Sequence, residues 1–373
     1  MKDRIERNGI IDIMKAIMIL CVVIYHLIYR KQNGMMDMLI KESIYVSIPL
    51  FVLIAGYFYR EGNGSIIMDV AKRMKKLVLP PIFIDAILLL IGGPYFMLVH
   101  GYGVKDWAYD SLMTYLRPEL MSSLVPDYVG GDLFNNLSPV WFIWALAFST
   151  IEFIIVMRII RGKKEEADIT SLVISMIILM ITGSILFVYS PALSWSLHVT
   201  PMYAGIMIMG VLIRRCQVPE KLEKMNLVLS GVIMIILWVL HFIIFKHFGS
   251  DCLYLSDFGS AGFISAAFLV IEVLMGGFIL FTIARFISLC SPLKNAFTWI
   301  GRHTLVILLV HCFIAGIVVD ILHTYNKPGP NWYVEPLTSE IVIKSVISFL
   351  VATIGSIGLA ALNDKIKMKF SKK

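Results

Sequence analysis

Residues 169–189, ITSLVISMIILMITGSILFVY, form an uninterrupted apolar stretch that contains no charged side chain. A helix needs about 20 mostly apolar residues to cross the hydrocarbon core of a bilayer. This stretch has that length and composition, so it predicts a transmembrane helix.

The rest of the chain has the same character. Hydrophobic residues make up 58% of the 373 residues and charged residues 16%, with a mean hydropathy of +0.81. A soluble domain averages roughly 45–50% apolar and about 25% charged residues. We therefore expect an all-α, polytopic membrane bundle of about ten transmembrane helices. The ten apolar runs cover approximately 10–29, 40–59, 78–99, 139–158, 169–189, 196–213, 227–245, 263–285, 304–322 and 340–362.

The basic residues orient these helices. Of the 33 Lys and Arg residues, 24 fall at the two termini and in the connections after the second, fourth, sixth and eighth runs. The alternate connections hold 7, and Lys15 and Lys344 lie inside runs. Cytoplasmic loops carry an excess of Lys and Arg. This distribution predicts that both termini are cytoplasmic, in a multi-pass protein of the plasma membrane.

The chain is expected to be a single transmembrane domain over 1–373, with one long external segment at about 100–138. The net charge of +7 does not indicate nucleic-acid binding, because the cations sit in short clusters between apolar runs. The five cysteines are scattered without CxxC spacing, so neither a disulfide framework nor a metal site is expected.

The first run carries ionisable residues where hydrocarbon is expected. At 100° per residue, His26 lies about 20° from Lys15 and about 40° from Asp12 around the helix, with Lys15 about 16 Å below His26 along the axis. Ionisable residues in a span usually face the bundle interior or a wet cavity. A low dielectric favours neutral imidazole, the form that a general base requires. Alternatively, Asp12 and Lys15 neutralise each other at i and i+3, and His26 bonds another helix.

Five segments of the sequence carry a family resemblance. They are, in order, the Arg7, Asp12, Lys15, His26 pattern, the stretch Pro49–Tyr57, the basic stretch from Lys72-Arg73 to Pro80-Pro81, Val140–Ile143, and Ile300–Leu305 through His311. Together they resemble the acyltransferase 3 family of membrane O-acyltransferases, with the fucose-4-O-acetylase-like branch the most similar. Ala55 and Leu308 depart from the family pattern, which commonly has serine and tyrosine there.

The resemblance implies transfer of an acyl group, usually acetyl, from cytoplasmic acyl-CoA to a hydroxyl of an extracytoplasmic carbohydrate. The acyl-CoA is a donor substrate, and no permanently bound cofactor is expected. His26 is the expected general base. His311 would orient His26, bind the carbonyl oxygen or protonate the leaving thiolate, and an acyl-histidine intermediate is a further alternative.

The expected donor site combines Asp12 and Lys15 with a basic loop that contains Lys72, Arg73 and Lys76, because such cations bind phosphate. Positive-inside topology alone would also place charges in this loop. Trp141 and Tyr57 are the candidate substrate-binding residues. An aromatic such as Trp141 at the outer mouth could stack on a sugar ring, or it could belong to an interfacial belt.

Other polar residues in the apolar runs are expected to be structural. Asp85, Glu152 and Glu272 are predicted hydrogen-bond partners, and His241 is predicted to lie at the membrane interface. The alternative function is a proton-coupled transporter or exporter of a glycan or acyl compound, since buried Asp, Lys and His also serve carriers. The paired halves and matching broken helices common in transporters are not evident in the sequence.

Overall fold

The computed structural model describes residues 9–28, 47–60, 65–100, 103–105, 140–162, 166–189, 193–248, 264–323 and 339–371. All regular secondary structure in these ranges is helical. The elements, in chain order, are α1 (Gly9–Ile28), a helix at Ser47–Tyr57, α3 (Ile66–His100), α6 (Val140–Arg161), α7 (Ile169–Tyr189), the 3-10 helix η3 (Ser194–Val199), α8 (Thr200–Arg215), α9 (Val218–Lys224), α10 (Leu227–Phe248), α11 (Ile264–Ser288), α12 (Ser291–Arg302), α13 (Thr304–His323) and α14 (Ser339–Ser371).

Each of the ten predicted apolar runs overlaps a helix in the described part of the chain, but the run at 40–59 meets only the short helix at Ser47–Tyr57, and the run at 196–213 is divided between η3 and α8. The run at 169–189 and α7 have identical bounds. Within the described residues, five helices are long and apolar enough to cross a membrane, or seven if each of two bent helix pairs is one span. The chain is therefore an all-helical membrane protein.

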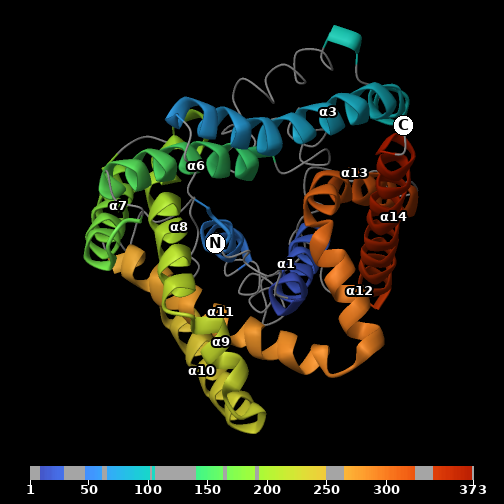
Figure 1. Ribbon diagram of the computed structural model, residues 1–373. Helices are drawn as coiled ribbons and strands as arrows, with labels where there is room; N and C mark the ends of the chain where they lie inside the picture. Colours follow the sequence, from blue (N-terminus) through green and yellow to red (C-terminus); the bar gives the residue numbers. More distant parts are fainter. Residues whose placement is uncertain are drawn as a thin grey trace.

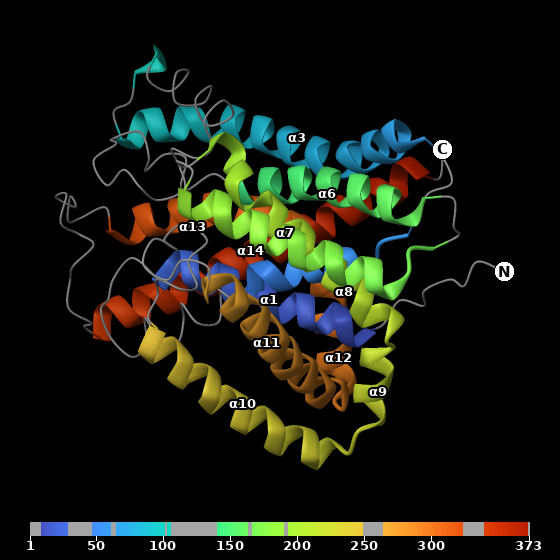
Figure 2. The ribbon, with the colours of Figure 1, turned by 90° about the vertical axis from the view of Figure 1, so that its left-hand side faces the viewer.

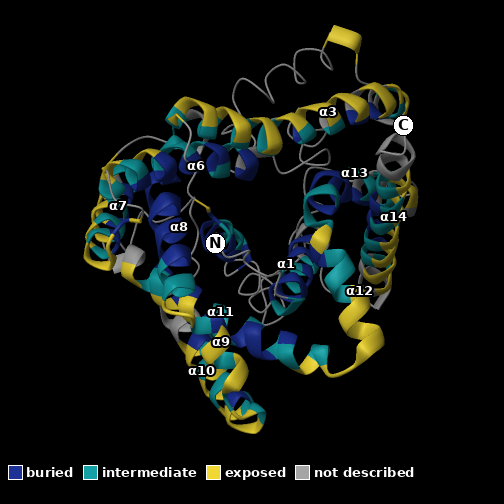
Figure 3. Ribbon diagram, in the orientation of Figure 1, coloured by how far each residue is buried: buried dark blue, intermediate teal, exposed yellow. Residues whose placement is uncertain are grey.

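Helix α1 lies in the interior, surrounded by α3, α6, α8, α11, α12 and α13 (Figure 1). It packs against α11, α12, α13 and α14. None of residues 9–24 is exposed, whereas α3, α7, α10 and α14 carry much of the exposed surface (Figure 3). The N-terminal end of α1 and the C-terminal end of α14 lie at the same end of the bundle (Figure 2).

The basic segment before the third run is a helix, not the loop that was predicted. Helix α3 begins at Ile66, so Lys72, Arg73 and Lys76 occupy its first three turns. The Ser65 hydroxyl accepts a hydrogen bond from the Met68 N–H at 3.3 Å, as an N-cap residue does. Lys, Arg and Met are good helix formers, so this segment continues the helix once it is capped.

The helix at Ser47–Tyr57 crosses α8 with its backbone in direct contact. A Cβ atom at Gly56 would lie 2.0 Å from the Met207 carbonyl oxygen, and one at Gly210 would lie 2.1 Å from the Leu53 carbonyl oxygen. Only glycine fits at both positions. Gly56 belongs to one of the five segments noted in the sequence, and this crossing is its structural role.

Two helices in the basic connections were not predicted. Helix α9 meets α10 at a bend of 116°, and α12 meets α13 at a bend of 81°. The Arg285 guanidinium donates to the carbonyl oxygens of Leu222, Glu223 and Met225, which secures the α9–α10 bend. Residue His303 forms the bend between α12 and α13.

Candidate active site

A buried carboxylate near the start of α1 holds two cations. The Asp12 side chain is 1% exposed, and its Oδ1 lies 2.6 Å from the Lys15 Nζ. The Arg302 Nε donates to Asp12 Oδ2 at 3.4 Å from the end of α12. Lys15 and Arg302 remain 18% and 48% exposed, so both cations reach solvent while their shared partner does not.

Close helix packing brings Arg302 to this carboxylate. A Cβ atom at residue 301 would lie only 1.7 Å from the Asp12 carbonyl oxygen. Gly301 therefore lets the last turn of α12 rest directly on the backbone of α1. The next residue, Arg302, is then placed beside the Asp12 side chain.

His303 fixes the bend that follows. Its Nδ1 lies 2.7 Å from the Trp299 carbonyl oxygen, and its ring stacks on the Trp299 ring at 4.1 Å between centroids. Its Nε2 lies 2.6 Å from Asp364 Oδ2 on α14. Both ring nitrogens thus face oxygen acceptors, and the imidazole ties the α12–α13 bend to α14. Its role in the structure is to position Arg302.

His311 is fully buried on α13, the helix that packs against α1. Its Nδ1 lies 3.0 Å from the Ile307 and 2.8 Å from the Leu308 carbonyl oxygens. Because a carbonyl only accepts, Nδ1 carries the proton, and in the neutral ring Nε2 is the basic nitrogen. The Cys312 Sγ lies 3.3 Å from Nε2. The carbonyl of Leu308, one of the departures from the family pattern, is thus one of the groups that fix this tautomer.

The structure describes only the backbone of two predicted site residues, His26 and Trp141. His26 lies on α1, on the same continuous helix as Asp12 and Lys15, and Trp141 lies in the first turn of α6. Their side chains are outside the described part of the structure, as is that of Asp85, and so is nearly all of the external segment at 100–138.

The basic residues of α3 differ in their contacts, because Arg73 binds the backbone that follows the preceding helix whereas Lys72 and Lys76 are exposed. The Arg73 guanidinium donates to the Arg60 carbonyl oxygen at 2.8 Å and lies over the Tyr59 ring at 4.6 Å. It therefore secures the end of the helix at Ser47–Tyr57. Lys72 and Lys76 are exposed on the outer side of α3.

Tyr57 ends its helix with a buried side chain, 5% exposed. Its ring packs edge-on against Phe58, with centroids 5.1 Å apart. The Arg214 guanidinium donates to the Tyr57 carbonyl oxygen at 3.0 Å and also to the Tyr59 carbonyl oxygen. A cation at this position satisfies carbonyls that a helix end leaves free.

Two of the carboxylates that were predicted to be structural, Glu152 and Glu272, contact side chains of neighbouring helices. The Thr200 hydroxyl donates to Glu152 Oε1 at 2.5 Å, which joins α8 to α6. The prediction that His241 lies at the interface is wrong, because its side chain is 4% exposed and contacts the Glu272 carboxylate of α11. An imidazole near the end of an apolar run suggests an interfacial position, but a carboxylate on the neighbouring helix draws this one inward.

Comparison with known protein families identifies the class to which this site belongs. A family model for an acyltransferase domain matches residues 8–362, nearly the whole chain. The chain belongs to the acyltransferase 3 family and is a membrane acyltransferase. No curated protein and no solved structure matches it.

The fold explains why two distant family segments belong together. The pattern that includes Asp12 and Lys15 and the segment that includes Gly301 and Arg302 meet at the α1–α12 contact. Arg302, which lies in the fifth family segment, and Asp364 were not predicted as site residues. The glycine directly before Arg302 is the one sequence signal of a close helix contact there.

Proposed function

We propose that the protein is an O-acyltransferase, most simply an O-acetyltransferase of the fucose-acetylase-like type. It would move the acyl group of cytoplasmic acyl-CoA to a hydroxyl of an extracytoplasmic glycan. The observation that carries the proposal is the buried Asp12 carboxylate with its two solvent-reaching cations, Lys15 and Arg302. Cations held in this way suit the phosphates of a CoA donor.

The proposed topology has ten spans and both termini in the cytoplasm, in the plasma membrane. It is supported by the ten helical runs, by the basic connections and by the placement of the two chain ends at one end of the bundle (Figure 2). In that orientation the Asp12 cluster faces the cytoplasm. His26 lies about 16 Å further along α1, toward the exterior.

The proposed chemistry uses this separation. The phosphates of the donor are held by Lys15 and Arg302, and its pantetheine arm extends along α1 toward His26. His26 takes the proton of the acceptor hydroxyl as the oxygen attacks the thioester carbonyl. The C–S bond breaks, and the proton passes to the leaving CoA thiolate. General base catalysis of this kind contributes roughly 10²–10⁴-fold.

His311 would assist from α13. With its Nδ1 proton bound to backbone carbonyls, Nε2 is the proton-accepting nitrogen, and it lies 3.3 Å from the Cys312 Sγ. In this proposal Nε2 accepts the proton that His26 took from the hydroxyl and passes it to the leaving thiolate, or it orients His26. Among the described residues, no group of three or more His, Cys, Asp and Glu side chains is arranged to hold a metal ion.

The test uses inside-out membrane vesicles from cells that produce the protein. Acetyl-CoA labelled in the acetyl group is added outside the vesicles, and label in the glycan fraction is measured together with free CoA. The His26→Ala variant should lose transfer at least 100-fold, because the general base is removed. Its abundance in the membrane should match the wild type.

Cys21→Ala, on the same helix, is the matched control and should keep full activity. Full transfer by His26→Ala would refute the role of His26. Movement of glycan across the membrane by the wild type without release of CoA would refute the transferase and favour the transporter alternative.

A further inference from the structure

One face of α3 is exposed from Lys72 to Leu90. Lys72, Leu79 and Leu90 share this face, because separations of 7 and 18 residues bring them within about 20° at 100° per residue. Lys75 and Lys76 lie one turn beyond Lys72. The apolar members of the stripe are well exposed, with Leu79 at 50%, Phe83 at 68% and Leu90 at 72%. In a membrane protein such a face contacts lipid.

No described residue neutralises the lysines at the N-terminal end of this face. Among the described residues, none of Lys72, Lys75 and Lys76 forms an ion pair. The nearest carboxylate along the helix, Asp69, is bound to Arg158 of α6 at 2.7 Å. Three uncompensated positive charges thus mark one edge of an otherwise apolar surface.

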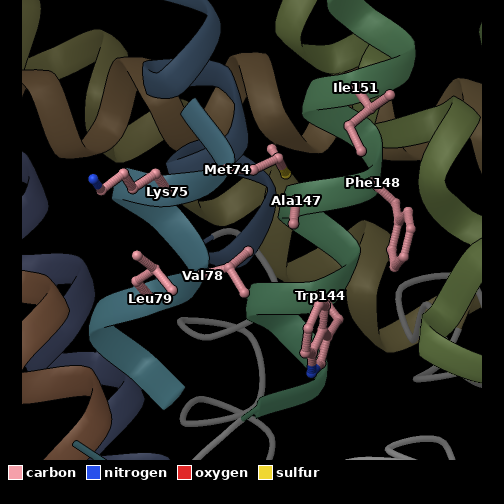
Figure 4. Close-up of a pocket in the computed structure, with 8 residues that line it drawn as sticks. All are labelled: Met74, Lys75, Val78, Leu79, Trp144, Ala147, Phe148 and Ile151. Atoms are coloured by element: carbon pink, nitrogen blue, oxygen red, sulfur yellow. The ribbon is translucent and has the colours of Figure 1, made fainter. Parts of the chain in front are cut away.

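An apolar cavity of about 400 Å³ adjoins these lysines, between α3 and α6. Figure 4 shows the Lys75 stem and Leu79 on α3 and the rings of Trp144 and Phe148 on α6. Lys75 is the one charged residue in its lining. The lining residues are Met74, Lys75, Val78, Leu79, Trp144, Ala147, Phe148 and Ile151.

We propose that this surface binds an anionic phospholipid from the leaflet at the N-terminal end of α3. The lipid phosphate contacts Lys72, Lys75 and Lys76, and one acyl chain enters the cavity between α3 and α6. Lysine stems lie along apolar surface while their ammonium groups reach the headgroup region. Basic clusters beside transmembrane helices attract anionic lipids electrostatically.

The charges argue against a second copy of the chain on this face. A two-fold axis along the membrane normal would bring the same three lysines of both copies together, and like charges repel. A phosphate-bearing lipid instead supplies the missing negative charge and an apolar chain of suitable shape. The inference is independent of the chemistry at Asp12.

Native mass spectrometry of the purified full-length chain tests the headgroup contact. The protein is titrated with dioleoyl phosphatidylglycerol or with dioleoyl phosphatidylcholine, which has the same chains and a net-neutral headgroup. The wild type should retain the phosphatidylglycerol more tightly. The triple variant Lys72→Gln, Lys75→Gln, Lys76→Gln should weaken its binding about tenfold or more.

The matched control is Lys221→Gln, Lys224→Gln, Lys294→Gln, which removes three exposed lysines from α9 and α12. It should leave the affinity for phosphatidylglycerol unchanged. An equal loss in this control, or equal retention of the two lipids by the wild type, would overturn the proposal.

The acyl-chain contact has its own test. Phosphatidylglycerol with a photoreactive diazirine in one chain should label peptides of α3 and α6. Ala147→Phe should reduce that labelling, because its ring occupies the cavity. Labelling confined to other helices, or lysine–lysine crosslinks between two copies across α3, would overturn the proposal.

Discussion

Among the described residues, two buried carboxylates contact a basic side chain of another helix, and the two sites differ in their access to water. Asp12 is buried, but its partners Lys15 and Arg302 are 18% and 48% exposed. Glu272 contacts His241, and these two side chains are only 2% and 4% exposed. The Asp12 site therefore reaches solvent through Lys15 and Arg302, whereas both side chains of the Glu272–His241 contact are shielded from solvent.

The charge balance separates the sites further. Among the described residues, Asp12 pairs with two cations, Lys15 and Arg302, so this cluster offers more positive than negative charge to an anionic ligand. Within the same part of the chain, Glu272 contacts one imidazole, that of His241, and the contact joins α10 to α11. A solvent-accessible site with more positive than negative charge suits the binding of an anionic ligand, and a buried pair suits the packing of two helices. Each prediction below tests this distinction.

Replacement of Asp12 should have the largest effect. Asp12→Ala leaves Lys15 and Arg302 to repel each other beside a buried gap, and breaking a buried ion pair in this way costs about 3–5 kcal/mol. Acyl transfer should fall below detection. Thermal unfolding in detergent and vesicle transfer assays measure the two effects.

Asp12→Asn keeps the side-chain volume, so it separates the effect of losing the charge from a general failure to fold. It should unfold at a temperature closer to the wild type yet still transfer at least tenfold more slowly. Asp69→Asn is the matched control, because it removes the carboxylate of a more exposed Asp–Arg pair. If Asp12→Asn were fully active, the Asp12 site would have no role in transfer.

Glu272→Ala should come next, and it should affect stability alone. Removal of the carboxylate that the buried His241 ring contacts should lower the free energy of unfolding by about 1–3 kcal/mol. Transfer per folded molecule should match the wild type. Glu272→Gln, which retains a hydrogen-bonding group, should lose less stability. A specific loss of transfer in folded Glu272→Ala protein would contradict the assignment of this pair to structure.

The sequence predicted the helices better than the contacts between them. Apolar length is a strong local signal, so α7 has its predicted bounds and α1 begins and ends within one residue of them. Helices α9 and α12 were missed, because they lie in basic connections and are too short to span a membrane. The ten-span topology itself stays a prediction.

The site was predictable only where its residues are neighbours in sequence. Asp12 and Lys15 pair at i and i+3, as helix geometry suggests. Arg302 joins them from far along the chain through the close approach at Gly301, and no local pattern identifies α1 as the helix that this glycine contacts. The interfacial prediction for His241 failed for a similar reason, since its partner Glu272 lies on another helix.

Gly301→Ala tests whether that close approach holds the Asp12 site together. The added Cβ would overlap the Asp12 carbonyl oxygen, so α12 must shift, at about 1–3 kcal/mol. Arg302 would move with it, and the KM for acyl-CoA should rise. Gly358→Ala is the matched control on α14, where a Cβ meets nothing within 4 Å. Its stability and its KM should equal those of the wild type, and the same result for Gly301→Ala would rule out a tight α1–α12 contact.

Neutralising the two cations singly should have the smallest effect. Lys15→Gln and Arg302→Gln each remove one of two phosphate contacts, so each should raise the KM for acyl-CoA about tenfold, or about 1.4 kcal/mol. The value of kcat should change little, because a uniform binding contact is lost. Lys294→Gln, also on α12 but exposed, should leave KM unchanged.

Because both cations share Asp12, the double variant should deviate from additivity, as coupled neighbours do. Strict additivity would mean that Lys15 and Arg302 act independently, and an unchanged KM in all three variants would place the donor elsewhere.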